Sequence, residues 1–119
     1  MKKMVETIKS RTDAPLILFG TNSEHLLQEM KATGADVIGI DWKTDLVKAW
    51  ESMNFEVAVQ GNLDPTLLFA EWDLIETRAK TLLKSIPNKS GYIFNLGHGI
   101  LPKTPEENVR NLVNLVQGS

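Results

Sequence analysis

Four short runs of nearly continuous apolar residues divide the chain, and each is followed by a segment whose apolar residues recur at helical spacing. Strands buried on both faces of a parallel sheet carry continuous apolar runs, whereas half-exposed strands alternate with period two. The runs therefore predict four buried parallel strands. They lie at residues 15–19, 36–40, 56–59 and 91–96.

The segments after the runs carry the signals with which helices start and stop. Residues 21–24 and 104–107 have the pattern of a capping box. Thr44 is a candidate N-cap, and the Asp-Pro pair at 64–65 fits a cap followed by a first helical position. Gly34 is expected to end the first helix in a left-handed conformation. The predicted apolar faces are Leu26, Leu27 and Met30; Leu46, Val47, Trp50 and Met53; Leu74, Ile75, Ala79, Leu82 and Ile86; and Val109, Leu112, Val113 and Val116.

The resulting order, βαβαβαβα, predicts an α/β fold with a parallel sheet and right-handed crossovers. Four such units suit a small open sheet. They also suit half of an eight-stranded (β/α)8 barrel, which takes about 250 residues in full. The apolar pattern alone does not decide between these architectures. No linker interrupts residues 1–119, so a single structural segment is predicted.

The composition narrows the range of functions. The 119 residues are 42% hydrophobic and 24% charged, and the net charge of −2 disfavours a nucleic-acid partner. The absence of cysteine excludes disulfides, thiolate metal ligands and a cysteine nucleophile. No apolar run is long enough to span a bilayer, and residues 1–9 do not resemble a signal peptide. A cytoplasmic protein without a membrane partner is expected.

A metal site is not expected either. The two histidines, His25 and His98, are far apart in the sequence, and neither has a second ligand at zinc-motif spacing. A Walker loop is absent, and Gly97 and Gly99 lack the third glycine of a dinucleotide-binding motif.

The candidate chemistry lies in polar residues after each strand, because ligand sites form at the carboxyl ends of parallel strands in both architectures. The sharpest segment is 95–102, where Gly97 and Gly99 flank His98. Glycine lets the backbone approach a ligand closely, and histidine can donate a hydrogen bond or place a positive charge near an anion. A glycine-rich turn with an incidental surface histidine explains the pattern equally well.

The other candidates also have structural alternatives. Gln60 and Asn62 bring amides to the end of the third strand, where they suit a ligand or a neighbouring loop. Asp41 is either a site carboxylate or a cap, and Trp42 either a pocket wall or a packing aromatic. Asp64 is better explained as an N-cap, because Asp-Pro is a regular helix opening.

Three of these segments, in this order and spacing, resemble the uroporphyrinogen decarboxylases. They are residues 34–42 (GADVIGIDW), 59–65 (VQGNLDP) and 94–102 (FNLGHGILP). The tail at 104–109 (TPEENV) follows the same pattern, so the resemblance covers nearly the whole chain.

The resemblance implies a (β/α)8 barrel and a cytosolic, cofactor-free, homodimeric enzyme. It implies decarboxylation of the four acetate side chains of uroporphyrinogen to give coproporphyrinogen in haem biosynthesis. In the family, the histidine that matches His98 lines the active-site cleft and helps to hold the substrate. Asp41, Trp42 and Gln60 match motif positions without an assigned role. The residues expected to line the site are Asp41, Gln60, Asn62, Gly97 and Gly99.

The departures from the family concern the other half of the active site. Family members are much longer than this chain, which corresponds to strands five to eight of the barrel. The arginines that bind substrate carboxylates, the aspartate that stabilises the pyrrole cation, and the site tyrosine and serine all lie upstream of it. The isolated chain is therefore expected to be inactive as a decarboxylase.

Two alternatives remain. The chain is either part of the enzyme, with the N-terminal half as its partner, or a non-catalytic half-barrel that associates with a second copy through exposed strand edges. A cobalamin- or zinc-linked methyltransferase of the same superfamily is disfavoured, because those enzymes generally use cysteine and histidine ligands. An open sheet face is expected to carry one residue from each of the pairs Ile17/Phe19, Val37/Ile38, Val57/Val59 and Ile93/Phe94.

Overall fold

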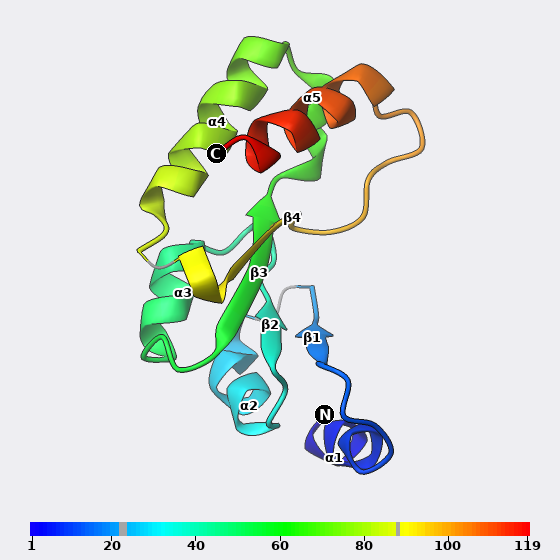
Figure 1. The fold of residues 1–119 in the computed structure, drawn as a ribbon, viewed down its shortest axis with the longest axis vertical. Helices are drawn as coiled ribbons and strands as arrows, with labels where there is room; N and C mark the ends of the chain where they lie inside the picture. Colours follow the sequence, from blue (N-terminus) through cyan, green and yellow to red (C-terminus); the bar gives the residue numbers. More distant parts are fainter. Residues whose placement is uncertain (22–23, 88) are drawn as a thin grey trace.

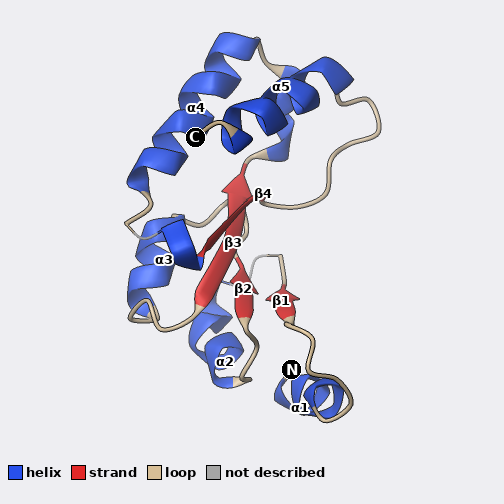
Figure 2. Ribbon diagram, in the orientation of Figure 1, coloured by secondary structure: helices blue, strands red, loops and turns tan. Residues whose placement is uncertain are grey.

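Each of the four apolar runs overlaps one of the four strands of a parallel sheet in the computed structural model (Figures 1 and 2). The structure describes residues 1–21, 24–87 and 89–119. The strand order is β1-β2-β3-β4, so each strand pairs with the next along the chain, and β1 and β4 form the two edges. This confirms the predicted α/β class. The strands are β1 (Ile17–Phe19), β2 (Val37–Gly39), β3 (Ala58–Leu63) and β4 (Tyr92–Leu96).

Strand register decides which side chains face the helices. Leu18, Ile38 and Val59 are in register and buried, and they belong to the hydrophobic core. In-register neighbours in a parallel sheet share a face, and the next residue along each strand lies on the other. That other face is open at Phe19 and Ile93, which remain 43% and 42% exposed.

Five α-helices accompany the strands in the described part of the chain, with short 3₁₀ segments between them. Figure 1 shows α2 and α3 alongside the sheet, and α4 and α5 side by side near the ends of β3 and β4. The helices are α1 (Lys2–Lys9), α2 (Leu27–Ala32), α3 (Leu46–Ser52), α4 (Trp72–Ser85) and α5 (Glu106–Gln117). The 3₁₀ segments are η1 (Glu24–Leu26), η2 (Pro65–Phe69) and η3 (Lys89–Gly91).

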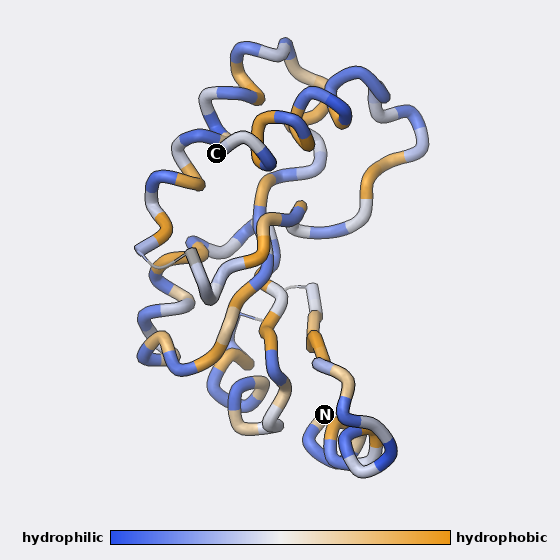
Figure 3. Tube along the Cα trace, viewed as in Figure 1, coloured by the Kyte–Doolittle hydropathy of each residue, from blue (hydrophilic) through white to orange (hydrophobic). Residues whose placement is uncertain are grey.

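The apolar residues on the helix side form two buried clusters. One is formed by residues that include Trp50, Met30 and Ile38 and lies between the sheet and helices α2 and α3. Figure 3 shows apolar residues, in orange, along the strands of the sheet. The second, around Leu68 and Ile75, packs α4 and α5 against the ends of β3 and β4. Leu82 contacts both clusters and so joins the two halves of the core.

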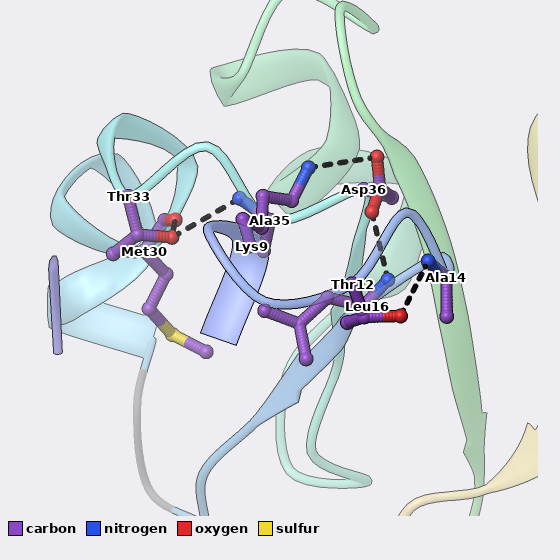
Figure 4. A network of polar contacts seen from close by, with 8 residues as sticks. All are labelled: Lys9, Thr12, Ala14, Leu16, Met30, Thr33, Ala35 and Asp36. Atoms are coloured by element: carbon purple, nitrogen blue, oxygen red, sulfur yellow. Dashed lines mark hydrogen bonds and ion pairs between the residues drawn. The ribbon is translucent and has the colours of Figure 1, made fainter. Parts of the chain in front are cut away.

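Helix α1 was not expected from the sequence. It is anchored by Val5, which is 1% exposed and packs in the first cluster. Its last residue, Lys9, places Nζ 3.1 Å from Oδ1 of Asp36, while Oδ2 of Asp36 accepts a 2.7 Å hydrogen bond from the Leu16 amide (Figure 4). Asp36 thus fastens α1 and the entry to β1 to the entry of β2.

Several predicted helix starts need correction. Asp45, not Thr44, is the N-cap of α3, and its side chain accepts a 3.1 Å hydrogen bond from the Lys48 amide. No capping box forms at α5, because Thr104 donates to the carbonyl of Leu101 instead. In the proposed box at 21–24, residues 22 and 23 lie outside the described residues.

Two other predicted signals are confirmed. Gly34 has φ +86° after the end of α2, as a left-handed cap requires. Asp64 caps through its side chain, which accepts a 2.9 Å hydrogen bond from the Thr66 amide, although the segment it opens is 3₁₀ rather than α-helical.

Candidate functional site

A hollow of about 320 Å³ lies at the carboxyl end of the sheet, in the position where a ligand site was expected. Phe19 and Gln60 contribute to it from the open sheet face, and His98 from the loop after β4. Apolar and polar groups therefore meet in one concave site. The full lining is Phe19, Gln60, Asn95, Leu96, His98, Gly99 and Ile100.

His98 is half-buried, and its Nδ1 lies 2.8 Å from the carbonyl oxygen of Gly99. Because a carbonyl only accepts hydrogen bonds, this contact requires the proton on Nδ1. Nε2 of the neutral ring is then an acceptor, and on protonation it becomes a donor on a cationic ring. A protonated His98 is suited to hold a carboxylate.

Gln60 and Asn95 bring amides to the same hollow. The main-chain carbonyl of Gln60 accepts a 2.8 Å hydrogen bond from the Ile40 amide, which fixes this part of β3 against β2. Asn95 begins the segment 95–102 but was not among the residues expected to line the site. The signal for it was present, because it stands two positions beyond Ile93 on β4 and so shares the open face.

Asp41 lies outside this lining. It is 3% exposed, and its Oδ1 accepts a 3.0 Å hydrogen bond from the Lys43 amide within the loop between β2 and α3. Its main-chain carbonyl accepts a further 3.1 Å hydrogen bond from the amide of Thr44. These contacts make Asp41 a stabilising residue of the loop that leads into α3.

Asn62 also lies outside the lining of the hollow, on buried backbone at the end of β3. Its Nδ2 donates a 2.9 Å hydrogen bond to the carbonyl of Asp41 and another to the carbonyl of Thr44. Both hydrogens of the amide are thus used to hold the loop between β2 and α3.

The two glycines around His98 differ in their surroundings. Gly97 is buried, its amide donates a 2.8 Å hydrogen bond to the carbonyl of Leu63, and an added Cβ would lie 2.3 Å from the backbone nitrogen of Trp42. Only glycine permits this approach. Gly99 lines the hollow, and a Cβ there would meet nothing within 4 Å.

Trp42 lines a different hollow, of about 620 Å³, between α3 and α4. Its ring is partly exposed, with Nζ of Lys43 5.7 Å from the ring centroid. Arg78 and Asp64 line the same space. The side chain of Trp42 is therefore a pocket wall, but on the helix side of the sheet.

Tyr92 connects the edge strand to β3. Its hydroxyl donates a hydrogen bond to the carbonyl of Gly61, and burial raises the pKa of the phenol above its ordinary value. The hydroxyl therefore stays protonated, and stays a donor, throughout the neutral range.

In the described part of the chain, no three histidine or acidic side chains gather as a metal site would need. Among the same residues, no helix has the length and apolar character needed to cross a membrane.

A known protein family matches the chain throughout. The family model described as "Uroporphyrinogen decarboxylase (URO-D)" matches residues 1–119. The chain belongs to the uroporphyrinogen decarboxylase family. The fold of the family is a TIM barrel, and the four-stranded parallel sheet fits a part of such a barrel.

The relatives are uroporphyrinogen decarboxylases of several bacteria. The chain is 49% identical over 114 residues to that of Koribacter versatilis (strain Ellin345), and 48% identical over 119 residues to that of Chloroflexus aggregans (strain MD-66 / DSM 9485). These alignments cover 96% and 98% of this chain but 32% and 33% of the relatives. The chain spans about a third of the length of the curated relatives it matches.

Proposed function

We propose that this chain is one structural segment, residues 1–119, of a uroporphyrinogen decarboxylase barrel, corresponding to its strands five to eight. There it supplies part of the site that converts the four acetate side chains of uroporphyrinogen to methyl groups. The observation that carries the proposal is the His98 hollow at the carboxyl ends of β3 and β4, in a chain that matches the family throughout.

The reaction needs an electron sink and no redox partner. The bond between the acetate methylene and its carboxylate breaks, carbon dioxide leaves, and the electron pair passes into a protonated pyrrole ring. This electron pair neutralises the ring and leaves an exocyclic methylene. A proton then adds to the methylene carbon to give a methyl group, and the proton that the ring first took up leaves, which restores the neutral pyrrole. A fixed carboxylate beside the pyrrole cation stabilises it electrostatically, so we propose that no cofactor takes part.

The residues of this chain serve substrate binding in this proposal. Protonated His98 holds a substrate carboxylate, and the amide of Gln60 offers a donor and an acceptor beside it. Gly99 keeps the rim of the hollow free of side chains, and Gly97 sets the path of the loop. The carboxylate that stabilises the pyrrole cation and the arginines that bind further substrate carboxylates come from the other part of the barrel.

The test is a chimera in which this chain replaces the matching third of the Koribacter versatilis enzyme. We expect the chimera to form coproporphyrinogen from uroporphyrinogen, and the isolated chain to form none, because positioning and charge stabilisation are both required. His98→Gln in the chimera is expected to raise KM by roughly 10- to 100-fold, the worth of about 1.5–3 kcal/mol for a hydrogen bond to a charged group.

The matched control is His25→Gln, which removes the other histidine and is expected to leave KM unchanged. A chimera that folds and binds substrate but forms no product contradicts the proposal. Equal kinetics for the His98 and His25 variants contradict the role of His98.

A second candidate function is self-association without catalysis. It is favoured by the open sheet face, where Ile17, Phe19 and Ile93 are 44%, 43% and 42% exposed between two unpaired strand edges. A second copy, or the N-terminal half of the barrel, would cover this face. In either case we propose a cytoplasmic protein that forms homo-oligomers.

A further inference from the structure

Asn62 occupies an unusual position for a residue next to a candidate substrate site. It is polar and 8% exposed, and it follows Gly61 at the end of β3. It lines the hollow between α3 and α4 with Trp42, not the hollow that Gln60 lines. Burial of an amide is costly unless its hydrogen bonds are made. The position is therefore best explained by what its two donated hydrogen bonds hold in place.

The amide of Asn62 holds both sides of Trp42. The carbonyl of Asp41 precedes Trp42, the carbonyl of Thr44 follows it, and the same Nδ2 donates to both. Within the same loop, the backbone amide of Lys43 donates a 3.0 Å hydrogen bond to the Asp41 side chain and so stabilises the turn around Trp42. The backbone of Trp42 is thereby fixed against the end of β3.

The loop that carries His98 packs directly against the backbone of Trp42. A Cβ on Gly97 would stand 2.3 Å from the nitrogen of Trp42 and 2.6 Å from its Cα, so the two main chains are in direct contact. The second support is the hydrogen bond from the Gly97 amide to the carbonyl of Leu63, the residue after Asn62. His98 follows immediately and lines the hollow.

We propose that Asn62 is a positioning residue for His98, acting through the backbone of Trp42 and Gly97. Only a side chain with two donors on one atom supplies both hydrogen bonds. Aspartate has the same shape but sets carboxylate oxygens against two carbonyl oxygens, and leucine supplies no donor. The use of His98 in substrate binding rests on the proposed function, whereas its placement by Asn62 does not.

The test compares Asn62→Leu and Asn62→Asp with the parent chain by ¹⁵N NMR of the histidine rings. The chain has two histidines, and His25→Gln assigns their signals. In the parent, the contact with Gly99 holds the proton of neutral His98 on Nδ1. We expect both variants to shift the ring toward the Nε2–H tautomer that a free imidazole prefers. The comparison is made on folded variants, because an unfolded chain would show the free-imidazole tautomer as well.

The matched control is Asn108→Leu. Asn108 in α5 also donates from Nδ2 to two carbonyls, those of Leu68 at 2.8 Å and Ala70 at 3.3 Å, but it holds η2 rather than the Trp42 loop. Its loss should lower the unfolding midpoint and leave the His98 ring nitrogens unchanged. An unaltered His98 tautomer in both Asn62 variants, or an equal change in Asn108→Leu, overturns the proposal.

A second variant keeps the test decisive where Asn62→Leu fails to fold. Gly97→Ala pushes on the backbone of Trp42 from the opposite side, and coupling between two sites is reciprocal. We expect it to shift the side-chain amide signals of Asn62 and to leave those of Asn108 in place. Unmoved Asn62 amide signals overturn the proposal, and these readouts are independent of decarboxylase activity.

Discussion

The two glycines that flank His98 have opposite tolerance for a side chain. Gly97 lies against the backbone of Trp42, whereas Gly99 faces open space at the rim of the hollow. Backbone at Trp42 cannot move aside as the end of a flexible side chain can, because Asn62 and Asp41 hold its loop. Replacement by alanine should therefore destabilise the fold at Gly97 and have little effect at Gly99.

We expect Gly97→Ala to lower the free energy of unfolding by roughly 1–3 kcal/mol, the usual cost of forcing extra atoms into a packed site. Gly99→Ala, the matched control, should change it by less than about 0.5 kcal/mol. Urea unfolding followed by circular dichroism measures both. Equal midpoints for the two variants would show that the close contact at Gly97 relaxes freely.

Predictions for single residues succeeded where the local sequence allows one structural role. They were incomplete where a polar residue could either line a site or stabilise a loop. Asp64 was recognised as a cap because Asp-Pro opens helices. Asp41 and Asn62 were placed at the correct end of the sheet, but the sequence does not state whether a polar side chain faces a cavity or a neighbouring loop. The Asp41 side chain accepts from the Lys43 amide in its own loop, and the Asn62 side chain donates to two carbonyls of that loop. These contacts exist only once the loop and the end of β3 have come together.

Among the elements, α1 depends on a small number of contacts. It buries Val5, and its end is fixed by the contacts of Lys9 and Leu16 with Asp36. The hydrogen bond from the Leu16 amide, and then Lys9, lower the pKa of Asp36 from its ordinary value of 3.8. Because the folded pKa is lowered, the stabilisation is complete above 3.8 and is lost as pH falls through the lowered value.

We expect Asp36→Asn to flatten the pH dependence of stability on the acid side of 3.8, since asparagine does not titrate. Lys9→Gln removes the weaker of the two named partners and should flatten it only in part. Denaturation midpoints measured across the acid range test both variants. If the denaturation midpoint of Asp36→Asn falls with pH as steeply as that of the parent, another carboxylate governs acid unfolding.

At this scale the sequence predicted the strands better than the helix ends. Each apolar run overlaps a strand, because burial on both faces leaves a continuous signal. The run at 56–59 covers only the first two residues of β3, and residues 60–63, which were expected to follow the strand, belong to it. Helix α1 was missed, because Val5 is its only buried residue and charged residues surround it. The N-cap of α3 was misplaced by one position, since Thr44 and Asp45 are both good caps and loop geometry selects between them.

At the scale of the whole molecule, the sheet has one covered face and one open face. The register places Phe19 and Ile93 on the open face and Leu18, Ile38 and Val59 in the core. Val37 shares the open face with Ile17 yet is buried, because strands flank it on both sides. The expectation of one open-face residue from each pair was wrong for Ile17/Phe19, which lie two positions apart and share the open face. It was also wrong for Val57/Val59, which both pack in the core.

We expect the isolated chain to self-associate through the open face, and Phe19→Glu to weaken that association by roughly 10- to 100-fold, the worth of about 1.5–3 kcal/mol for a buried phenylalanine. Phe69→Glu is the matched control, because Phe69 is 46% exposed but lies in η2. Light scattering over a dilution series measures both. A parent that remains monomeric at micromolar concentration, or equal weakening by both variants, contradicts this prediction.

The strand order also has a consequence for synthesis on the ribosome. Every pairing in the sheet joins neighbours in the chain, with partners such as Leu18 and Ile38, or Val59 and Tyr92, about 20 to 33 positions apart. No strand waits for a distant partner within this segment. Each new βα unit can therefore add to an already formed edge as translation proceeds, and β1 and β4 remain as the two edges of the sheet.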